Sequence, residues 1–191
     1  MKRLFLLSCM FLIIISSKTL AQNILPDSGK VGIGTRTPTQ MLDVNGSINL
    51  PTTISSTIGV IYNGSAPLLH TYTAAGSDGH NLFLGPVSGN FTLSPGGGGS
   101  YMASGNVGIG PYTLTSLTTG FDNSAFGVTS LAANTTGFAN LGIGSRTLTS
   151  NVWGYGNVAL GTYSLQQNVG GHTMWLSVTL LAKAQPPRCR T

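Results

Sequence analysis

The tripeptide Gly-Ile-Gly occurs three times in this sequence, at 32–34, 108–110 and 142–144. Glycine-rich loops can bind phosphate when they lead into a helix, because their backbone N–H groups converge on the anion. That fingerprint needs a third glycine three residues after the second, and these places hold Thr37, Thr113 and Thr147. No helical periodicity follows any copy, and the sequence contains no G-x-x-x-x-G-K-[ST] motif. The tripeptides therefore predict turns, not nucleotide binding.

Other residues that could support catalysis or hold a metal are scattered along the chain. The four acids are separated widely, which leaves no evident carboxylate pair of the glycosidase kind: Asp27, Asp43, Asp78 and Asp122. The three histidines, His70, His80 and His172, have no metal-ligand spacing with one another or with Cys189. Asp78-Gly79 lacks the further ligands of a calcium loop, and no serine sits in a G-x-S-x-G elbow. We therefore expect no catalytic, cofactor-binding or metal-binding residues.

The second and third tripeptides instead belong to a 17-residue repeat, with four copies at 103–119, 120–136, 137–153 and 154–170, and the first is a degenerate relative of it. The sixth residue of each copy is small and the seventh is large and apolar. The fourth residue is always Asn, the eighth always Gly and the twelfth always Leu: Asn106, Asn123, Asn140, Asn157, Gly110, Gly127, Gly144, Gly161, Leu114, Leu131, Leu148 and Leu165. A fixed period with fixed columns indicates one structural unit stacked on the next.

Each unit is too short and too rich in glycine for a pair of helices, but it can hold two short strands and two turns. We expect the apolar side chains at positions seven and twelve to stack inside the protein. The Asn columns should lie at turns and bond along the stack, and the glycine should mark a bend or a close approach of backbones. The predicted fold is all-β, a parallel β-solenoid or β-roll of 17-residue coils, preceded by an irregular β-hairpin region.

The chain before the repeats divides by composition into three parts. Residues 1–21 have a basic start, an apolar run and a small residue at the end, which predicts a secretory signal peptide and hence export. Residues 22–58 form an N-terminal module with a hairpin at 41–50, where Asn45-Gly46 is the turn signal. Residues 59–102 are an irregular β segment with a flexible, glycine-rich joint at 95–100.

The repeats extend over 103–171, and residues 172–191 form an atypical tail. The codons of Met174-Trp175 are fixed, and in another frame they encode the valine that the repeat has at position five. Two interpretations stay open: a frameshift near residue 173, or a divergent C-terminal cap.

Charge excludes two classes of partner. Between Gln22 and Gly171, three basic residues stand against four Asp, a net charge of −1, although the whole chain carries +5. No basic patch is left for nucleic acid or an anionic membrane surface. No apolar run after the signal is long enough to span a bilayer, so we expect no membrane insertion after signal cleavage.

Two stretches resemble known families. GKVGIGTRTPTQMLDVNGSI, residues 29–48, resembles a module that opens many secreted or phage-like tail-fibre-domain proteins of Gram-negative bacteria. The copies with N-x-A-x-G-x-x-x-L-x-x-N resemble the head repeats of trimeric autotransporter adhesins. The resemblance implies a trimeric, non-enzymatic β fibre, secreted or at the surface of a Gram-negative cell, that displays or binds there. A cell-surface or polysaccharide receptor would be its partner.

The thin core expected of each unit also favours a homotrimer. Burial stabilises a coil by about 1.5–3 kcal/mol for each large apolar side chain, and each coil has only two or three of these. Ordering the backbone costs about 1–2 kcal/mol for every one of its residues, so burial within one coil does not offset that cost. Such a chain can gain the missing burial by sharing its core with other chains.

The sequence thus predicts a structural or adhesive fibre segment that is exported and not an enzyme. One alternative is a carbohydrate-binding module, with Phe121, Phe138 and Tyr155 facing outward as stacking platforms, although we expect these rings to face inward. A less favoured alternative is a secreted polysaccharide-degrading β-helix enzyme.

Overall fold

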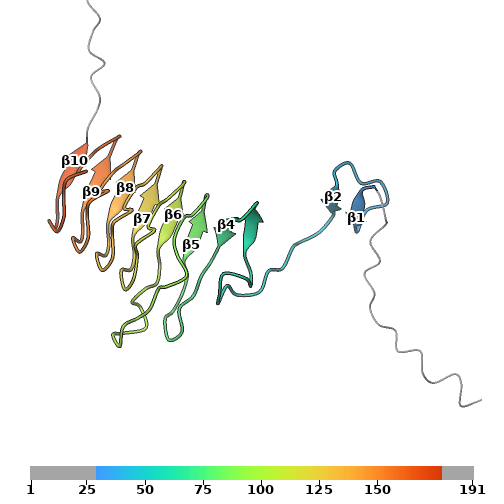
Figure 1. The fold of residues 1–191 in the computed structure, drawn as a ribbon, viewed down its shortest axis with the longest axis horizontal. Coiled ribbons are helices and arrows are strands. Elements are labelled where there is room, and N and C mark those ends of the chain that lie inside the picture. The colour runs from blue at the N-terminus through green and yellow to red at the C-terminus, as the bar shows by residue number, and fades with distance from the viewer. Residues whose placement is uncertain (1–28, 178–191) are drawn as a thin grey trace, which may run out of the picture. The chain divides into compact units, whose positions relative to one another are not determined.

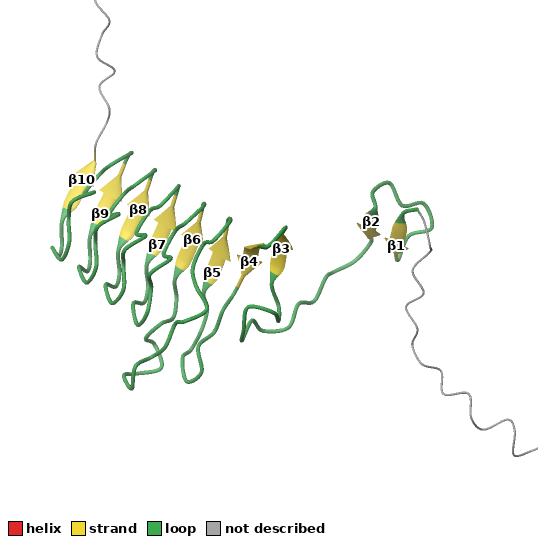
Figure 2. Cartoon of the chain, in the orientation of Figure 1, coloured by secondary structure: helices red, strands yellow, loops and turns green. Residues whose placement is uncertain are grey.

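A computed structural model of the protein describes residues 29–177. The expected signal peptide, 1–21, and residues 178–191 of the tail lie outside the described residues, together with Cys9 and Cys189. The described part consists of ten short strands joined by turns and loops, and it contains no helix (Figure 2). The expectation of an all-β protein is confirmed. Within 29–177 there is accordingly no helix that could cross a membrane.

The described chain forms two compact units, divided between Asn49 and Leu50. The first unit holds β1 (Val31–Ile33) and β2 (Leu42–Val44), which pair in parallel. The hairpin predicted at 41–50 is therefore wrong. The backbone N–H of Asn45 donates to the carbonyl oxygen of Ile33 at 2.8 Å, so the Asn-Gly dipeptide extends a parallel ladder instead of reversing the chain.

The second unit contains one eight-stranded sheet in which the strands follow one another in chain order (Figure 1). Its strands are β3 (Ile61–Asn63), β4 (Ala66–His70), β5 (Leu82–Leu84), β6 (Val107–Ile109), β7 (Ser124–Phe126), β8 (Leu141–Ile143), β9 (Val158–Leu160) and β10 (Trp175–Ser177). The pairs β3–β4 and β4–β5 are antiparallel, and all pairs from β5 to β10 are parallel.

The antiparallel end of the sheet is a hairpin, β3–β4, with a two-residue loop at Gly64-Ser65. Gly64 has a φ of 60°, the left-handed conformation that a type II′ turn needs at its first central residue. The hairpin occupies the edge of β5 and ends the parallel arrangement on that side.

The parallel strands step along the sequence with the period of the repeat. Val107 pairs with Ser124, Ser124 with Leu141, and Leu141 with Val158. The stretch 81–85 pairs with the first repeat in the same sheet, since Leu82 pairs with Val107. The separation in sequence between these two residues is longer than one repeat. The glycine-rich segment 95–100 lies in the loop between these two strands and does not separate two units. The tail begins in register as well, since Trp175 pairs with Val158.

The loops between strands are also bonded from one repeat to the next. The backbone N–H groups of Leu114, Leu131 and Leu148 donate to carbonyl oxygens of the following repeat, at 3.3, 2.9 and 3.1 Å. Each repeat therefore contacts its neighbour along both its strand and its loop, and the stack is continuous from β5 to β10.

The glycine at position eight is required where the strand ends. Gly110, Gly127 and Gly144 have φ values of 128°, 118° and 130°. A Cβ on Gly127 would lie 2.6 Å from the carbonyl oxygen of Gly144 in the next repeat. The left-handed backbone and the close stacking together exclude every other residue type.

Candidate interaction surface

The middle residue of each strand from β5 to β9 points into the stack. In β5 this residue is Phe83, and in β7 and β9 it is Ala125 and Ala159, all fully buried. In β6 and β8 it is Gly108 and Gly142. Successive side chains of a strand point to opposite faces, so the residues on either side of these must point outward.

A small residue is needed in the middle of β6 to β9 because a buried hydroxyl lies opposite it. A Cβ on Gly142 would meet the Oγ1 atom of Thr147 at 2.8 Å. The opposite residue is Thr where the strand has Gly, and Ser where it has Ala: Gly108 with Thr113, Ala125 with Ser130, Gly142 with Thr147, and Ala159 with Ser164.

The two hydroxyl types point in different directions. The Thr147 hydroxyl donates to the carbonyl oxygen of Gly144 in its own repeat, at 3.1 Å. The Ser130 hydroxyl instead points to the next repeat, where its oxygen lies 2.7 Å from the Thr147 hydroxyl and 3.2 Å from the carbonyl oxygen of Gly142. The serine thereby leaves room for the alanine methyl group of its own repeat.

The leucines of position twelve fill the rest of the interior. Leu114, Leu131 and Leu148 are fully buried, and Leu165 is nearly so. All four have φ between 48° and 52°, a left-handed backbone that costs a residue with a Cβ about 1–2 kcal/mol. Burial of a leucine side chain contributes about 1.5–3 kcal/mol, which is enough to offset that strain.

The asparagines of position four form a buried column along the stack. The Oδ1 atom of Asn123 accepts hydrogen bonds from the backbone N–H and the Nδ2 group of Asn140, at 3.2 and 3.0 Å. The same pattern links Asn81, Asn106, Asn123, Asn140 and Asn157. A second column joins Asn134, Asn151 and Asn168 through their side-chain amides. The columns join the repeats and leave no group free for a ligand.

The apolar side chains of position seven do not lie inside, which corrects the expectation from the sequence. Ile143 and Leu160 keep 43% and 40% of their surface exposed. They follow the inward-facing small residue by one position, so they share the outward side of the sheet with position five. The signal was present in the sequence: position five is also apolar in three of the four copies, as Val107, Leu141 and Val158. Two apolar columns flanking a small one predict an apolar outer side.

We call this surface the outer face and define it by the first and last residues of β5 to β9 together with Trp175 of β10. It consists of Leu82, Leu84, Val107, Ile109, Ser124, Phe126, Leu141, Ile143, Val158, Leu160 and Trp175. None of these residues is charged, and each is half-buried or exposed. Solvent-exposed, contiguous apolar rows of this kind are typical of interaction surfaces.

Two hollows open on this surface, one near each end of the sheet. Val158, Leu160, Trp175 and Leu176 line a hollow of about 280 Å³. A second hollow, of about 380 Å³, is lined by residues 50–52, Gly59, residues 69–71 and Leu82. Trp175 is 77% exposed at the rim of the first. The outer face is therefore not flat, and apolar side chains from a partner could enter it.

No family matches the chain. Comparisons with family models, with curated proteins and with solved structures give no match. The outer face must therefore be interpreted from its own chemistry.

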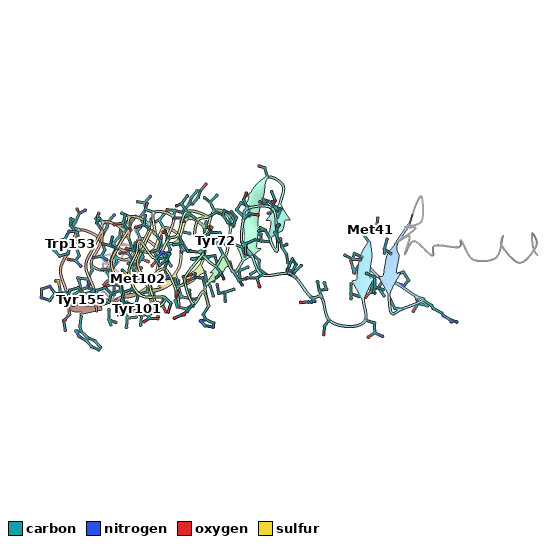
Figure 3. All side chains as sticks on the ribbon, turned by 90° about the horizontal axis from the view of Figure 1, so that it is seen from below. Met41, Tyr72, Tyr101, Met102, Trp153 and Tyr155 are labelled. Carbon is teal, nitrogen blue, oxygen red and sulfur yellow. The ribbon has the colours of Figure 1, made fainter. Side chains whose placement is uncertain are left out.

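The aromatic residues of position two form a row in which the rings cover one another. Phe121 stacks on Phe138 with 4.7 Å between ring centroids and 4° between planes, and Phe138 stacks on Tyr155 at 4.7 Å and 3°. His172 continues the row at 5.1 Å from Tyr155, and Tyr101, labelled with Tyr155 in Figure 3, contacts Phe121 edge-on. These rings are half-buried or exposed, so they do not face inward as expected. Both faces of the Phe138 ring are covered, by Phe121 and Tyr155, and both faces of the Tyr155 ring are covered, by Phe138 and His172.

The residues considered for chemistry remain apart. No group of three or more His, Cys, Asp or Glu side chains that could hold a metal exists within 29–177. The Gly-Ile-Gly amides are engaged in the sheet, since the N–H of Gly110 donates to Leu84 and that of Gly144 to Phe126, both at 2.8 Å. Strand pairing leaves these amides unable to cradle a phosphate.

Proposed function

We propose that the chain is a segment of an exported, non-enzymatic fibre in which copies of this protein pack through their outer faces. In this proposal the 17-residue units stack as a parallel β-solenoid or β-roll. Three chains meet around a common axis and form a homotrimer. The assembled rod displays its loops to a cell-surface or polysaccharide receptor on the outside of a Gram-negative cell.

The apolar outer face is the observation that carries this proposal. The interior of a single stack holds mainly leucines, small residues and hydrogen-bonded Asn, Ser and Thr, while the larger branched side chains of the strands point outward. A second copy suits the outer face because it carries an identical row with the same spacing between strands. The face has no charge that would repel a like copy. Each strand contributes only three residues, so the row is narrow, and three narrow rows can enclose one shared core.

The resemblance of 29–48 and of the repeats to tail-fibre and adhesin families supports the same assignment, as do the signal-like residues 1–21. The carbohydrate-binding alternative gains no support from the aromatic row, because stacking on sugars requires free ring faces and these faces cover one another. The three described acids, Asp43, Asp78 and Asp122, lie in separate segments, and no observation favours a hydrolase.

A single charge on the outer face tests the proposal. We expect Ile143→Asp to reduce the mass measured by light scattering from that of three chains to that of one, because a buried carboxylate without a partner opposes assembly. Val128 is a matched control, since it is 45% exposed and lies outside the outer face. Val128→Asp should leave the trimer mass unchanged. Equal behaviour of the two variants would sink the proposal.

A further inference from the structure

One histidine of the described chain is buried, and it lies where the antiparallel hairpin meets the parallel strands. His70 ends β4 and is 2% exposed, whereas His80 and His172 are exposed. It pairs with Phe83 in the middle of β5. His70 therefore belongs to the junction through which β3 and β4 cover the edge of β5.

The hydrogen bonding of His70 identifies the tautomer of its neutral ring. Its Nε2 atom lies 2.9 Å from the carbonyl oxygen of Ser88. A carbonyl oxygen can only accept, so Nε2 carries the hydrogen and Nδ1 has a free lone pair. Nδ1 is buried and has no hydrogen-bond partner. A proton arriving at His70 would bind at Nδ1, where no acceptor awaits it.

Two aromatic rings pack against His70, which also lines the hollow beside Leu69, Thr71 and Leu82. The ring centroid of His70 lies 4.9 Å from that of Phe83 and 4.4 Å from that of Phe91. The segments that pack around it, 50–77 and 81–100, contain no Asp, Glu, Lys or Arg. Tyr72 packs against Phe91 with 5.5 Å between ring centroids, and Asp78 and His80 are exposed in the following loop. No opposite charge can compensate a protonated His70.

We propose that the β3–β4 hairpin is an acid-released cap on the parallel sheet, with His70 as its trigger. Protonation makes the buried ring a cation without a counter-charge, and the hairpin relieves this by detaching from β5. Detachment breaks the bond from the N–H of Gly85 to the carbonyl oxygen of Leu68, 2.8 Å, and uncovers the backbone edge of β5. An uncovered edge can pair with a strand of another chain. Acid would therefore switch that end of the sheet from closed to open.

The direction of the pH effect follows from burial. Burial lowers the pKa of His70 below its ordinary value of 6.5, and the hydrogen bond to Ser88 offsets this only in part. The open form takes up the proton more readily than the closed form. The closed cap is thus fully stable above about pH 6.5 and loses stability as the pH falls from there toward the lowered pKa.

Hydrogen exchange on the full chain tests the cap. On going from pH 7.5 to pH 5, after correction for intrinsic exchange, we expect opening at β3, β4 and the β5 edge to increase by up to about 30-fold. Protection of β7 and β8 should stay unchanged. His80→Gln/His172→Gln leaves His70 as the sole histidine of the chain, and this variant should keep the acid effect. His70→Phe, which fills the same apolar site without titrating, should abolish it.

Several results would overturn the proposal: loss of the effect in the double variant, its persistence in His70→Phe, or simultaneous opening of β7 and β8. If His70→Phe does not fold, the double variant still decides, because its single imidazole can be followed by NMR. That signal must titrate below pH 6.5 in parallel with cap opening. Titration at or above 6.5, or opening without titration, contradicts the trigger.

Discussion

Asn140 illustrates at the scale of one residue why position four admits a single amino acid. Its Oδ1 atom accepts from the backbone N–H and the Nδ2 group of Asn157, at 3.0 and 2.9 Å. Its Nδ2 group donates to Asn123 and to the carbonyl oxygen of Gly154, at 3.0 and 2.7 Å. Only a carboxamide supplies two donors and a double acceptor in this volume.

We predict that Asn140→Asp lowers the free energy of unfolding by at least about 2 kcal/mol, because it removes both donors and buries a charge. Urea denaturation measures the loss. Asn168→Asp is the control: this residue is half-buried at the end of the second column, and its Nδ2 bond is long, at 3.4 Å. A similar loss in both variants would show that the buried column contributes nothing special.

Thr129 is a strained residue whose replacement should stabilise the protein. Its φ is 55°, unfavourable for a β-branched side chain, and its buried hydroxyl has no hydrogen-bond partner. Thr129→Asn should raise the free energy of unfolding by about 0.5–1 kcal/mol, since Asn tolerates the left-handed region better. Thr136→Asn, at an exposed position without positive φ, should change it little. If Thr129→Asn lowered the free energy of unfolding, the claim that Thr129 is strained would be refuted.

At the scale of the strand and its loop, the interior is fitted by pairs of positions. Positions six and eleven vary together: Gly at position six occurs with Thr at position eleven, and Ala occurs with Ser. Each pair therefore contributes one methyl group, either from the Thr or from the Ala, to the same space. This covariation is visible in the sequence, but its meaning depends on knowing that the two positions face each other.

We predict that Gly142→Ala destabilises the protein by about 1–3 kcal/mol, because the new methyl group meets the hydroxyls of Thr147 and Ser130. Adding Thr147→Ser should recover part of the loss, since a serine hydroxyl can turn to the next repeat. Thermal or urea unfolding of both single variants and the double variant measures the coupling. Strictly additive effects would contradict the pairing.

The same scale shows what sequence could predict. The repeat predicted the 17-residue strand register, because a fixed period forces equivalent residues to pair. The repeat alone does not show which apolar column faces inward. That follows only when positions five and seven are taken together, because both flank the small residue at position six. The dipeptide Asn45-Gly46 predicted a hairpin from local turn chemistry alone. In the structure Leu42–Val44 pairs in parallel with Val31–Ile33, eleven residues earlier, and not with the residues after the dipeptide. The hairpin at 61–70 carries a turn signal of the same kind, Asn63-Gly64, and there the chain does reverse.

At the scale of the whole molecule, one sheet presents small residues to its own loops and large apolar residues to the outside. Exported fibre, trimer and receptor remain proposals that this arrangement supports. The acid-released cap is argued from other observations than the trimer, because His70 is not one of the residues that define the outer face, although it lines the hollow beside Leu82.

Sedimentation equilibrium of the full chain at neutral pH, over a range of concentrations, tests the central claim most directly. The chain has a mass of 19.7 kDa, and we predict that the folded protein sediments as a species of three times that mass. A folded species that retains the mass of one chain at every concentration would contradict the claim that the outer face is covered by other copies.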